Sequence, residues 1–300
     1  MSTVVASPLV TIGLPVYNSE RYLRQSLDSL LAQTYSEFVL VISDNASTDG
    51  TAQICQEYAA RDSRVEYFRN ATNIGNPGNF NRVFELAKTK YLKWSTGDDF
   101  WEPTFVARAL EVMERDDSIA LCYPNAYFVD ADGRNPTPYH DRLHLIQDDP
   151  TERFKSLIGR IERAHQHLGL IRMSHLRRTH LLGAHVHSDI NLLAELVLYG
   201  KFWELPERLF YRRFHETSGS WNRGDKSHDA AYYLAAGARE ANLTRWHWHA
   251  RFFAAVARAP LPLAGKLRLY DFLLRRVYWN RAVLVQELRD RFVPGRSRKE

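Results

Sequence analysis

Residues 91–100 read YLKWSTGDDF: a short apolar strand, a turn at Thr96-Gly97, and two adjacent carboxylates, Asp98 and Asp99. Carboxylates this close repel each other and destabilise the fold unless a cation neutralises them. A hard divalent ion such as Mg²⁺ or Mn²⁺ does so, and it keeps positions open for substrate phosphates. The alternative is a solvated turn that caps the helix after Pro103, because Asp is common in turns.

Three more predicted strands precede this one, and a predicted helix separates each strand from the next. This alternation indicates an α/β fold with a parallel sheet and right-handed crossovers. The predicted strands are Leu9–Leu14, Phe38–Ile42, Val65–Phe68 and Tyr91–Ser95; the predicted helices run from about Ser19 to Gln33, from the 43–50 loop to Ala60, and from the 70–79 loop to Ala87.

Polar loops follow three of these strands, at residues 15–18, 44–50 and 97–99. Ligands bind beyond the carboxyl ends of the strands in such sheets. The position of these loops therefore predicts a nucleotide-sized site. No G-x-G-x-x-G follows the first strand and no G-x-x-x-x-G-K-S/T occurs, which argues against an ordinary dinucleotide site and a P-loop.

The second half predicts a less regular order of elements. His165/His167 and His185/His187 are two H-x-H pairs, each of which would share one face of a strand, but no cysteine completes a zinc set. The predicted segments are a helix over Pro103–Arg115, strands over Ile119–Tyr123 and Ala126–Val129, a mobile loop over Asn135–Pro150, a helix over Thr151–Arg163, an edge strand over His165–Arg172, a helix over Ile190–Tyr199, strands over Trp203–Leu205 and Arg208–Arg213 around a turn, and mostly helix over 226–292.

The length of 300 residues and the apolar content of 45% suit one large α/β domain, or one domain with an appendage. The two cysteines lack metal-type spacing and are interpreted as reduced, buried thiols in a reducing compartment. No signal peptide is visible, and no apolar run approaches the ~20 residues of a membrane span. We therefore expect a cytoplasmic protein.

Positive charge is concentrated at the C-terminal end. Residues 245–300 carry 13 Lys and Arg against 4 Asp and Glu, a net charge of +9, so the remaining residues carry −4 of the total of +5. One predicted helical face in this segment consists of Leu267, Tyr270, Leu274, Val277 and Tyr278, and we favour a helix that packs on the rest of the chain. The alternative is an interfacial helix on an anionic membrane surface, which would make the protein peripheral to the inner face of the membrane. Nucleic acid is not an expected partner, because no recognised binding motif accompanies the basic segment.

Seven stretches, in order, resemble a family 2 glycosyltransferase of the GT-A fold. The resemblance covers roughly residues 8–220. It implies an α/β GT-A (Rossmann-like) mostly parallel sheet flanked by helices, with residues 1–224 as the nucleotide-sugar-binding and catalytic domain and residues 225–300 as a basic helical C-terminal extension. The stretches are VTIGLPVYNSERYLRQSLDSLLAQTY (10–35), VISDNASTDGT (41–51), the 73–81 loop, STGDD (95–99), GLIR (169–172), SDINLLAEL (188–196) and YGKFWELPERLFYRRFH (199–215).

This resemblance assigns a donor-nucleotide site to the first half. Pro15 and Tyr17 line the base pocket, where Tyr17 can stack on the base, and Asn18 belongs to the same nucleotide-binding loop. Asp44 accepts from the base imide or the ribose. Helix capping is the alternative role for Asp44.

The resemblance also assigns the metal and the general base. Asp98 and Asp99 correspond to the D-x-D element that binds ribose and the metal; we assign Asp98 to the nucleotide and Asp99 to Mn²⁺ or Mg²⁺. His215 matches a family histidine that can approach the metal or the diphosphate. Asp189 occupies the position of the catalytic base, although Ser188 replaces the Glu that usually precedes it. A helix N-cap is the alternative role for Asp189.

Two further residues are candidates for contact with the sugar or the acceptor. Arg212 and Arg213 can clamp diphosphate, but one of two neighbours in a strand must point away from the site. We assign the contact to Arg212. We favour a place in the core or at its rim for Trp94 and Trp101; of the two, Trp101 lies beside the Asp pair in sequence and is the better candidate for contact with sugar.

The implied function is transfer of a sugar from a nucleotide-diphosphate donor to an acceptor hydroxyl, with inversion at the anomeric carbon. The expected donor is a UDP-sugar. A base takes the acceptor proton and a metal neutralises the leaving diphosphate. The implied role is cell-surface polysaccharide or glycolipid synthesis, with a saccharide or lipid-linked acceptor. Two alternatives stay open: a nucleotide-sugar-binding protein without transferase activity, and a membrane-surface interaction module.

Overall fold

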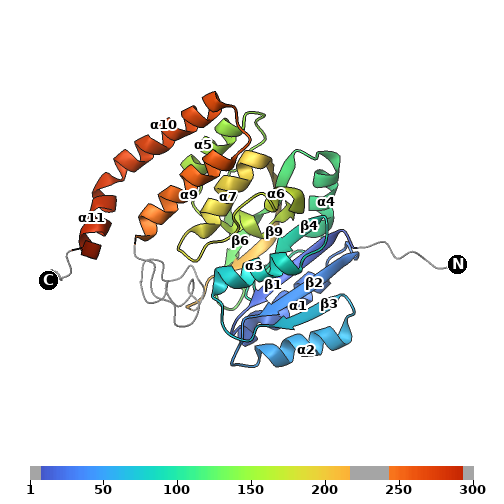
Figure 1. Ribbon diagram of the computed structural model, residues 1–300. Coiled ribbons are helices and arrows are strands. Elements are labelled where there is room, and N and C mark those ends of the chain that lie inside the picture. The colour runs from blue at the N-terminus through green and yellow to red at the C-terminus, as the bar shows by residue number, and fades with distance from the viewer. Residues whose placement is uncertain (1–7, 217–242, 293–300) are drawn as a thin grey trace.

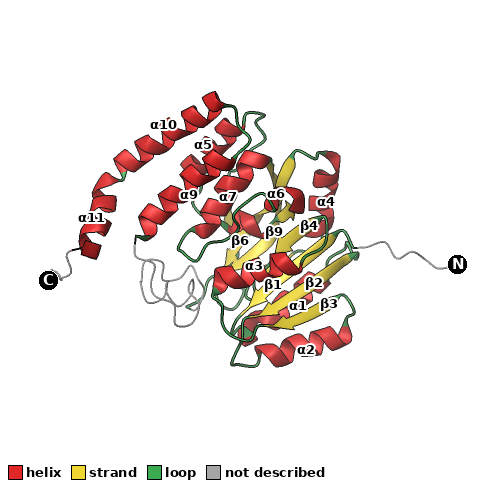
Figure 2. Cartoon of the chain, in the orientation of Figure 1, coloured by secondary structure: helices red, strands yellow, loops and turns green. Residues whose placement is uncertain are grey.

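The computed structural model describes residues 8–216 and 243–292. Its strands form one sheet in the order β3-β2-β1-β4-β8-β6-β9-β5, with β7 paired to β6. Helices flank this sheet (Figures 1 and 2). The α/β architecture predicted from the sequence is confirmed.

The first half alternates strand and helix as predicted. Strand β1 pairs in parallel with β2 and β4, and β2 pairs in parallel with β3. The elements are β1 Val10–Val16, α1 Glu20–Leu31, β2 Phe38–Asp44, α2 Thr51–Arg61, β3 Val65–Arg69, α3 Asn76–Leu86 and β4 Tyr91–Trp94.

Burial explains why β1 is central. All seven of its residues are buried, as expected for a parallel strand covered on both faces. Helix α1 turns Leu23, Leu27 and Leu30 toward the core at helical spacing. At Gly13, an added Cβ would lie 2.1 Å from Cγ1 of Val83, so only glycine allows α3 to pack this closely on β1.

The second half is built on two long strands. Strand β6 pairs in parallel with β9 and antiparallel with β8, which also pairs antiparallel with β4. The elements are β5 Phe100–Trp101, α4 Phe105–Arg115, β6 Ile119–Val129, β7 Thr137–Tyr139, α5 Pro150–Arg160, the 3-10 helix η1 His165–Leu168, β8 Leu170–Arg172, α6 Met173–Leu176, α7 Ser188–Tyr199 and β9 Lys201–Arg213.

The predicted breaks within β6 and β9 are wrong. Each is one continuous strand, and the register between them shifts at Pro124 and Asn125. The side chain of Asn125 donates to the carbonyls of Leu205 and Pro206. A bulge therefore accommodates the prolines without ending either strand.

Two other segments also differ from the prediction. Residues 165–168 form a 3-10 turn and not an edge strand, and β8 lies inside the sheet between β4 and β6. Residues 135–150, expected as a mobile loop, contain β7 and two buried leucines, Leu143 and Leu145. The backbone of Leu145 exchanges two hydrogen bonds of 2.9 Å with Phe202, which holds this segment against β9.

Three helices follow the undescribed residues: α9 Thr244–Arg258, α10 Leu263–Trp279 and α11 Arg281–Phe292. Helix α9 packs on α7, and α10 contacts α5 and α9. Phe252 of α9 is buried with its ring edge-on to Phe154 of α5. The favoured prediction, that the C-terminal segment packs on the rest of the chain, is confirmed by these contacts of α9 and α10. The predicted packing face of α10 is wrong, because Leu267, Leu274 and Tyr278 are exposed. Residues 226–242 and the 224/225 boundary lie outside the described residues. Within the described part of the chain, no helix is long and apolar enough to cross a membrane.

Candidate active site

The carboxyl ends of β1, β2 and β4 meet at one edge of the sheet. Val16 lies opposite Asp44 in the β1–β2 register, and the amide of Ser95, just after β4, donates to the carbonyl of Gly13. Asn18 connects two of the following loops, because its amide donates to Ser47 and its side-chain oxygen accepts from the amide of Thr48. The predicted gathering of the three polar loops is confirmed.

Asp98 and Asp99 occupy different environments at this edge. The side chain of Asp98 is 28% exposed, and its Oδ2 lies 2.9 Å from Nε2 of His215. Asp99 is only 5% exposed, and it accepts from the hydroxyl of Thr96 at 2.7 Å and from the amide of Arg213 at 2.8 Å. The structure thus brings His215 to Asp98, and Asp98 is the more accessible carboxylate of the pair.

These environments move the two carboxyl pKa values apart. Burial opposes ionisation of Asp98, but the hydrogen bond and the charge of His215 together lower the pKa of Asp98 below its usual value. Burial and the neighbouring charge of Asp98 raise the pKa of Asp99 to about 7. The pair therefore carries an energetic penalty when both members ionise, and a bound cation would relieve it.

The side chains here fit a metal ion whose coordination sphere is completed by the phosphates of the substrate. Within residues 8–216 and 243–292, no group of three or more His, Cys, Asp or Glu side chains forms a ready-made metal site. Mg²⁺-type ions, however, are commonly held by one or two carboxylates together with substrate phosphates. Asp98, Asp99 and the nearby His215 supply such a partial set.

Arg213 clamps the turn that carries the Asp pair. Its Nε donates to the carbonyl of Asp98, and its terminal nitrogens donate to the carbonyl of Ala131 and to the side chain of Gln25. Arg212 lies instead beside His165, with 3.4 Å between Nη1 and Nδ1. Strand alternation predicted that one arginine points away, but the sequence did not reveal that Arg213 is the clamp.

The predicted base-pocket residues differ in accessibility. Tyr17 is 46% exposed and follows β1 directly, so its ring is available to a ligand. Pro15 is buried within β1, opposite Ser43. Asn18 adopts a left-handed conformation with φ of 47° and holds the loop through the bonds described above.

Asp44 is completely buried and already hydrogen-bonded. It accepts from Tyr67 at 2.8 Å, from Arg69 at 3.0 Å and from the amide of Ser47 at 2.9 Å. A carboxylate offers about four lone-pair sites, so one more donor is possible. The side chain of Arg69, which donates to Asp44, is 44% exposed and lies between Asp44 and solvent.

Asp189 stands in the first turn of α7 and is not its N-cap. His187 holds the cap position with a left-handed φ of 65°, and Asp189 accepts from the adjacent amide of Ile190 at 2.8 Å. The N-cap alternative is therefore wrong, although a carboxylate here still interacts favourably with the helix dipole. Glu195, on the same helix, is buried and held by His180 and Arg258, which leaves Asp189 as the accessible carboxylate.

The histidines do not pair as a zinc site. Nε2 of His165 lies 2.8 Å from Oδ2 of the buried Asp141, whereas Nδ1 of His167 contacts the carbonyl of Ala164. Because a carbonyl only accepts, Nδ1 of His167 carries the proton and Nε2 is left as an acceptor. Burial lowers the pKa of His167, against the charge of Asp189. A neutral His167 near Asp189 is a feature that sequence reasoning missed.

Trp101 belongs to the core. It is 4% exposed, its ring stacks between Phe105 and Phe210, and its indole N–H donates to Ser95 at 3.1 Å. The buried ammonium of Lys93 lies 3.5 Å from the centre of the ring. The suggestion that Trp101 contacts sugar is therefore wrong. Trp101 is close to the Asp pair in sequence, but its side chain points into the core.

A small polar pocket opens beside the start of α7. It is a shallow depression with room for about one water molecule. The lining includes His185 and Ser188 next to Asp189, and Arg251 from α9. A C-terminal helix thus contributes a charged side chain to the surroundings of the predicted base.

The comparisons with known proteins agree with this geometry. The model of the family described as "Glycosyl transferase family 2" matches residues 11–179, more than half of the chain. The chain is 33% identical over 132 residues to the chondroitin synthase of Escherichia coli, which covers 44% of this chain and 19% of that protein. It is 31% identical over 147 residues to the putative teichuronic acid biosynthesis glycosyltransferase TuaG of Bacillus subtilis, covering 47% and 56%. The chain therefore spans less than two thirds of these relatives.

Solved structures share the fold. S. aureus TarS 1–349 in complex with UDP-GlcNAc has a TM-score of 0.68 at 18% identity, over 90% of this chain and 72% of that one. The mannosyltransferase PcManGT from Pyrobaculum calidifontis, in complex with GDP-Man and Mn²⁺, has a TM-score of 0.53 at 15% identity, over 97% and 89%. The expected GT-A fold is confirmed, and the chain belongs to glycosyl transferase family 2.

Proposed function

We propose that this protein is a metal-dependent, inverting glycosyltransferase that moves a sugar from a UDP-sugar to an acceptor hydroxyl. The observation that carries the proposal is the meeting of three strand ends at one edge of the sheet, with exposed Tyr17, the Asp98–Asp99 pair and His215 around it. An aromatic ring for a base and a carboxylate pair for a metal–diphosphate match the two ends of a nucleotide diphosphate.

The first half would bind the donor. Tyr17 stacks on the base, and Asp44 limits the depth of the base pocket together with Arg69. Asp98, Asp99 and His215 would hold Mn²⁺ or Mg²⁺, which neutralises charge on the leaving diphosphate. Arg212 lies close enough to lower the pKa of Asp99 by its charge, so it would also stabilise negative charge at the diphosphate.

The second half would supply the base. The acceptor oxygen attacks the anomeric carbon, the bond from that carbon to the diphosphate oxygen breaks, and Asp189 takes the acceptor proton. One displacement inverts the anomeric configuration. His167, held neutral, offers its Nε2 as an acceptor that can orient the incoming hydroxyl.

The choice of donor and acceptor follows the relatives. A UDP-sugar is supported by the structure of TarS with UDP-GlcNAc, and Mn²⁺ by that of PcManGT. The names of the chondroitin and teichuronic acid relatives support a saccharide or lipid-linked acceptor in surface polysaccharide synthesis. We place the reaction in the cytoplasm, at the inner face of the membrane.

A nucleotide-sugar-binding protein without transferase activity is the second candidate, because Ser188 stands where the family usually has Glu. A screen of UDP-, GDP- and dTDP-sugars with Mn²⁺ tests both. The transferase proposal expects one UDP-sugar to bind only with metal and to be hydrolysed slowly without acceptor. Binding without any turnover would support the second candidate, and no metal-dependent binding would contradict both.

A further inference from the structure

Helices α10 and α11 carry an unusual share of the exposed apolar side chains. Of the eleven large hydrophobic residues that are exposed in the described part of the chain, seven lie on the surface of these two helices, between residues 263 and 285. They are Leu263, Leu267, Leu274, Tyr278, Trp279, Val283 and Val285. We call this surface the α10–α11 face.

This face is not needed to hold the helices in place. Helix α10 packs through a different stripe, with Leu269 and Leu273 buried and Tyr270 stacked on Phe253 of α9. At 100° per residue, Leu263, Leu267, Leu274 and Tyr278 fall within an arc of about 60°, and the buried Leu269 and Leu273 lie about 80–120° from its nearer edge, with the half-buried Tyr270 between them. The exposed stripe is therefore a second apolar surface, available to a partner.

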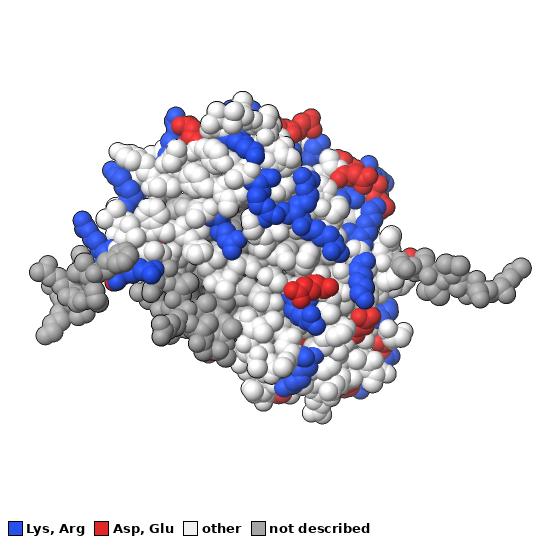
Figure 3. All heavy atoms as spheres, viewed as in Figure 1, with Lys and Arg blue, Asp and Glu red and all other residues white. Residues whose placement is uncertain are grey.

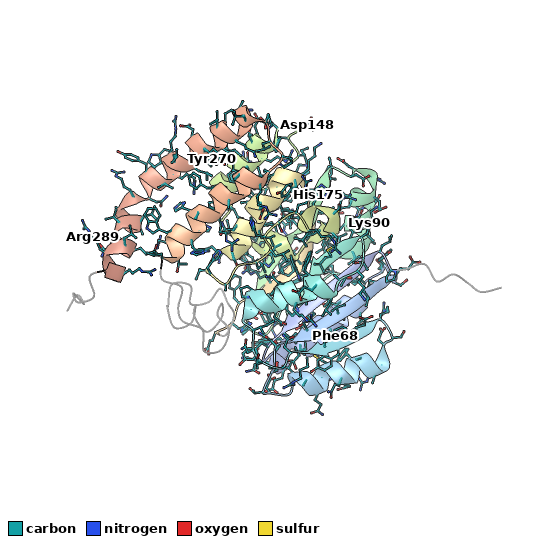
Figure 4. All side chains as sticks on the ribbon, viewed as in Figure 1. Phe68, Lys90, Asp148, His175, Tyr270 and Arg289 are labelled. Carbon is teal, nitrogen blue, oxygen red and sulfur yellow. The ribbon has the colours of Figure 1, made fainter. Side chains whose placement is uncertain are left out.

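Basic side chains accompany the apolar ones. Between residues 263 and 291 the chain has seven Lys and Arg against three Asp and Glu, and Asp271 is paired with Arg275. Figure 4 shows side chains projecting from the outer side of both helices, with Tyr270 and Arg289 labelled. In Figure 3, Lys and Arg atoms outnumber Asp and Glu atoms on the face in view. The exposed arginines on these helices are Arg268, Arg275, Arg281, Arg289 and Arg291.

We propose that the α10–α11 face docks on the surface of an anionic lipid bilayer. Leucines enter the boundary between headgroups and acyl chains, Tyr278 and Trp279 have the amphipathic rings suited to that boundary, and the arginines meet the lipid phosphates. The helices lie on the surface and do not cross it.

Charge favours a bilayer over a second copy of this chain. A two-fold dimer places the same patch on both subunits, so this net-positive face would meet itself. Such a contact brings like charges together, whereas an anionic bilayer attracts them. Membrane docking does not depend on the proposed chemistry, because none of the residues that carry it belongs to the candidate active site.

Co-sedimentation of the full chain with vesicles tests this proposal. We expect binding to phosphatidylcholine vesicles that contain phosphatidylglycerol, and little binding to pure phosphatidylcholine. The double variant Leu267→Glu/Leu274→Glu should lose at least about tenfold in vesicle affinity, because both side chains are exposed and contribute apolar contact. Arg281→Gln and Arg289→Gln should each cost about fivefold, and less at high salt.

The matched control is Leu9→Glu/Ile146→Glu, which places the same two charges at exposed apolar residues outside the face and should bind vesicles like the parent. UDP binding by every variant should match the parent, which separates this proposal from the proposed function. Equal binding to neutral and anionic vesicles, or parental binding by the leucine variant, would overturn the proposal. Absence of vesicle binding together with a dimer that the leucine variant dissociates would also overturn it, in favour of a second copy.

Discussion

The two halves of the site are held by different means. The strand-end cluster of the first half is held by the parallel register of its strands and by hydrogen bonds from Arg213. The amide of Arg213 donates to the carboxylate of Asp99, and its Nε donates to the carbonyl of Asp98. The start of α7 rests on one left-handed residue, His187, with polar side chains around it. A rigid cluster suits a constant task, which we propose is donor binding. A helix start between irregular loops suits a substrate-specific task, which we propose is acceptor activation.

The strongest way to break this division is to remove metal binding from the first half. Asp99→Asn should abolish Mn²⁺-dependent UDP binding and reduce turnover to background, because one anionic ligand is lost beside the diphosphate. Calorimetry with and without Mn²⁺ measures this. Asp116→Asn is the matched control, since Asp116 and Asp117 form another adjacent pair away from the site. Unchanged binding by Asp99→Asn, with Asp98→Asn defective, would move the metal to Asp98.

The second half is tested at its carboxylate. Asp189→Asn should lower turnover by ~10²–10⁴-fold, the usual contribution of a general base. Its stability should change by less than ~1 kcal/mol, because only the favourable interaction with the helix dipole is lost. Glu152→Gln, at the first-turn carboxylate of α5, serves as the control and should retain full turnover. Near-parental turnover of Asp189→Asn would refute the base role.

The base pocket gives a smaller effect. Tyr17→Ala should weaken UDP binding by ~1–3 kcal/mol, which is about fivefold to 150-fold, because the ring stacks on uracil in this proposal. The fold should be unaffected because Tyr17 is exposed. Tyr278→Ala, at an exposed tyrosine of α10, should leave UDP affinity unchanged. Parental affinity in the Tyr17 variant would place the base elsewhere.

The pH dependence of the Asp pair sharpens the comparison further. The pKa of Asp99 is raised to about 7 from 3.8. Without metal, its contribution to the free energy of unfolding is therefore fully present below about pH 4 and is lost as the pH rises through about 7. Thermal unfolding should show this loss in the parent and not in Asp99→Asn. Because metal needs the ionised carboxylate, Mn²⁺ affinity should rise between about pH 6 and 8; a flat profile would contradict the raised pKa.

The sequence predicted the first half better than the second for physical reasons. Strands β1 to β4 are short apolar runs between helices of clear periodicity, so local pattern determines their order. Strands β6 and β9 pass through Pro124 and Pro206 by means of a bulge, which depends on the side chain of Asn125 reaching across to its partner. Trp101 and Arg213 have sequence neighbours in the site, but long-range stacking and hydrogen bonds decide where their side chains lie.

The most direct test of the division of labour is the donor dissociation constant of three proteins under identical conditions: the parent, Asp99→Asn and Asp189→Asn, titrated with UDP in Mn²⁺. We predict that Asp99→Asn loses metal-dependent binding and that Asp189→Asn binds within about twofold of the parent, since a general base contacts the acceptor and not the diphosphate. Equal loss in both variants, or equal binding in both, would contradict the account.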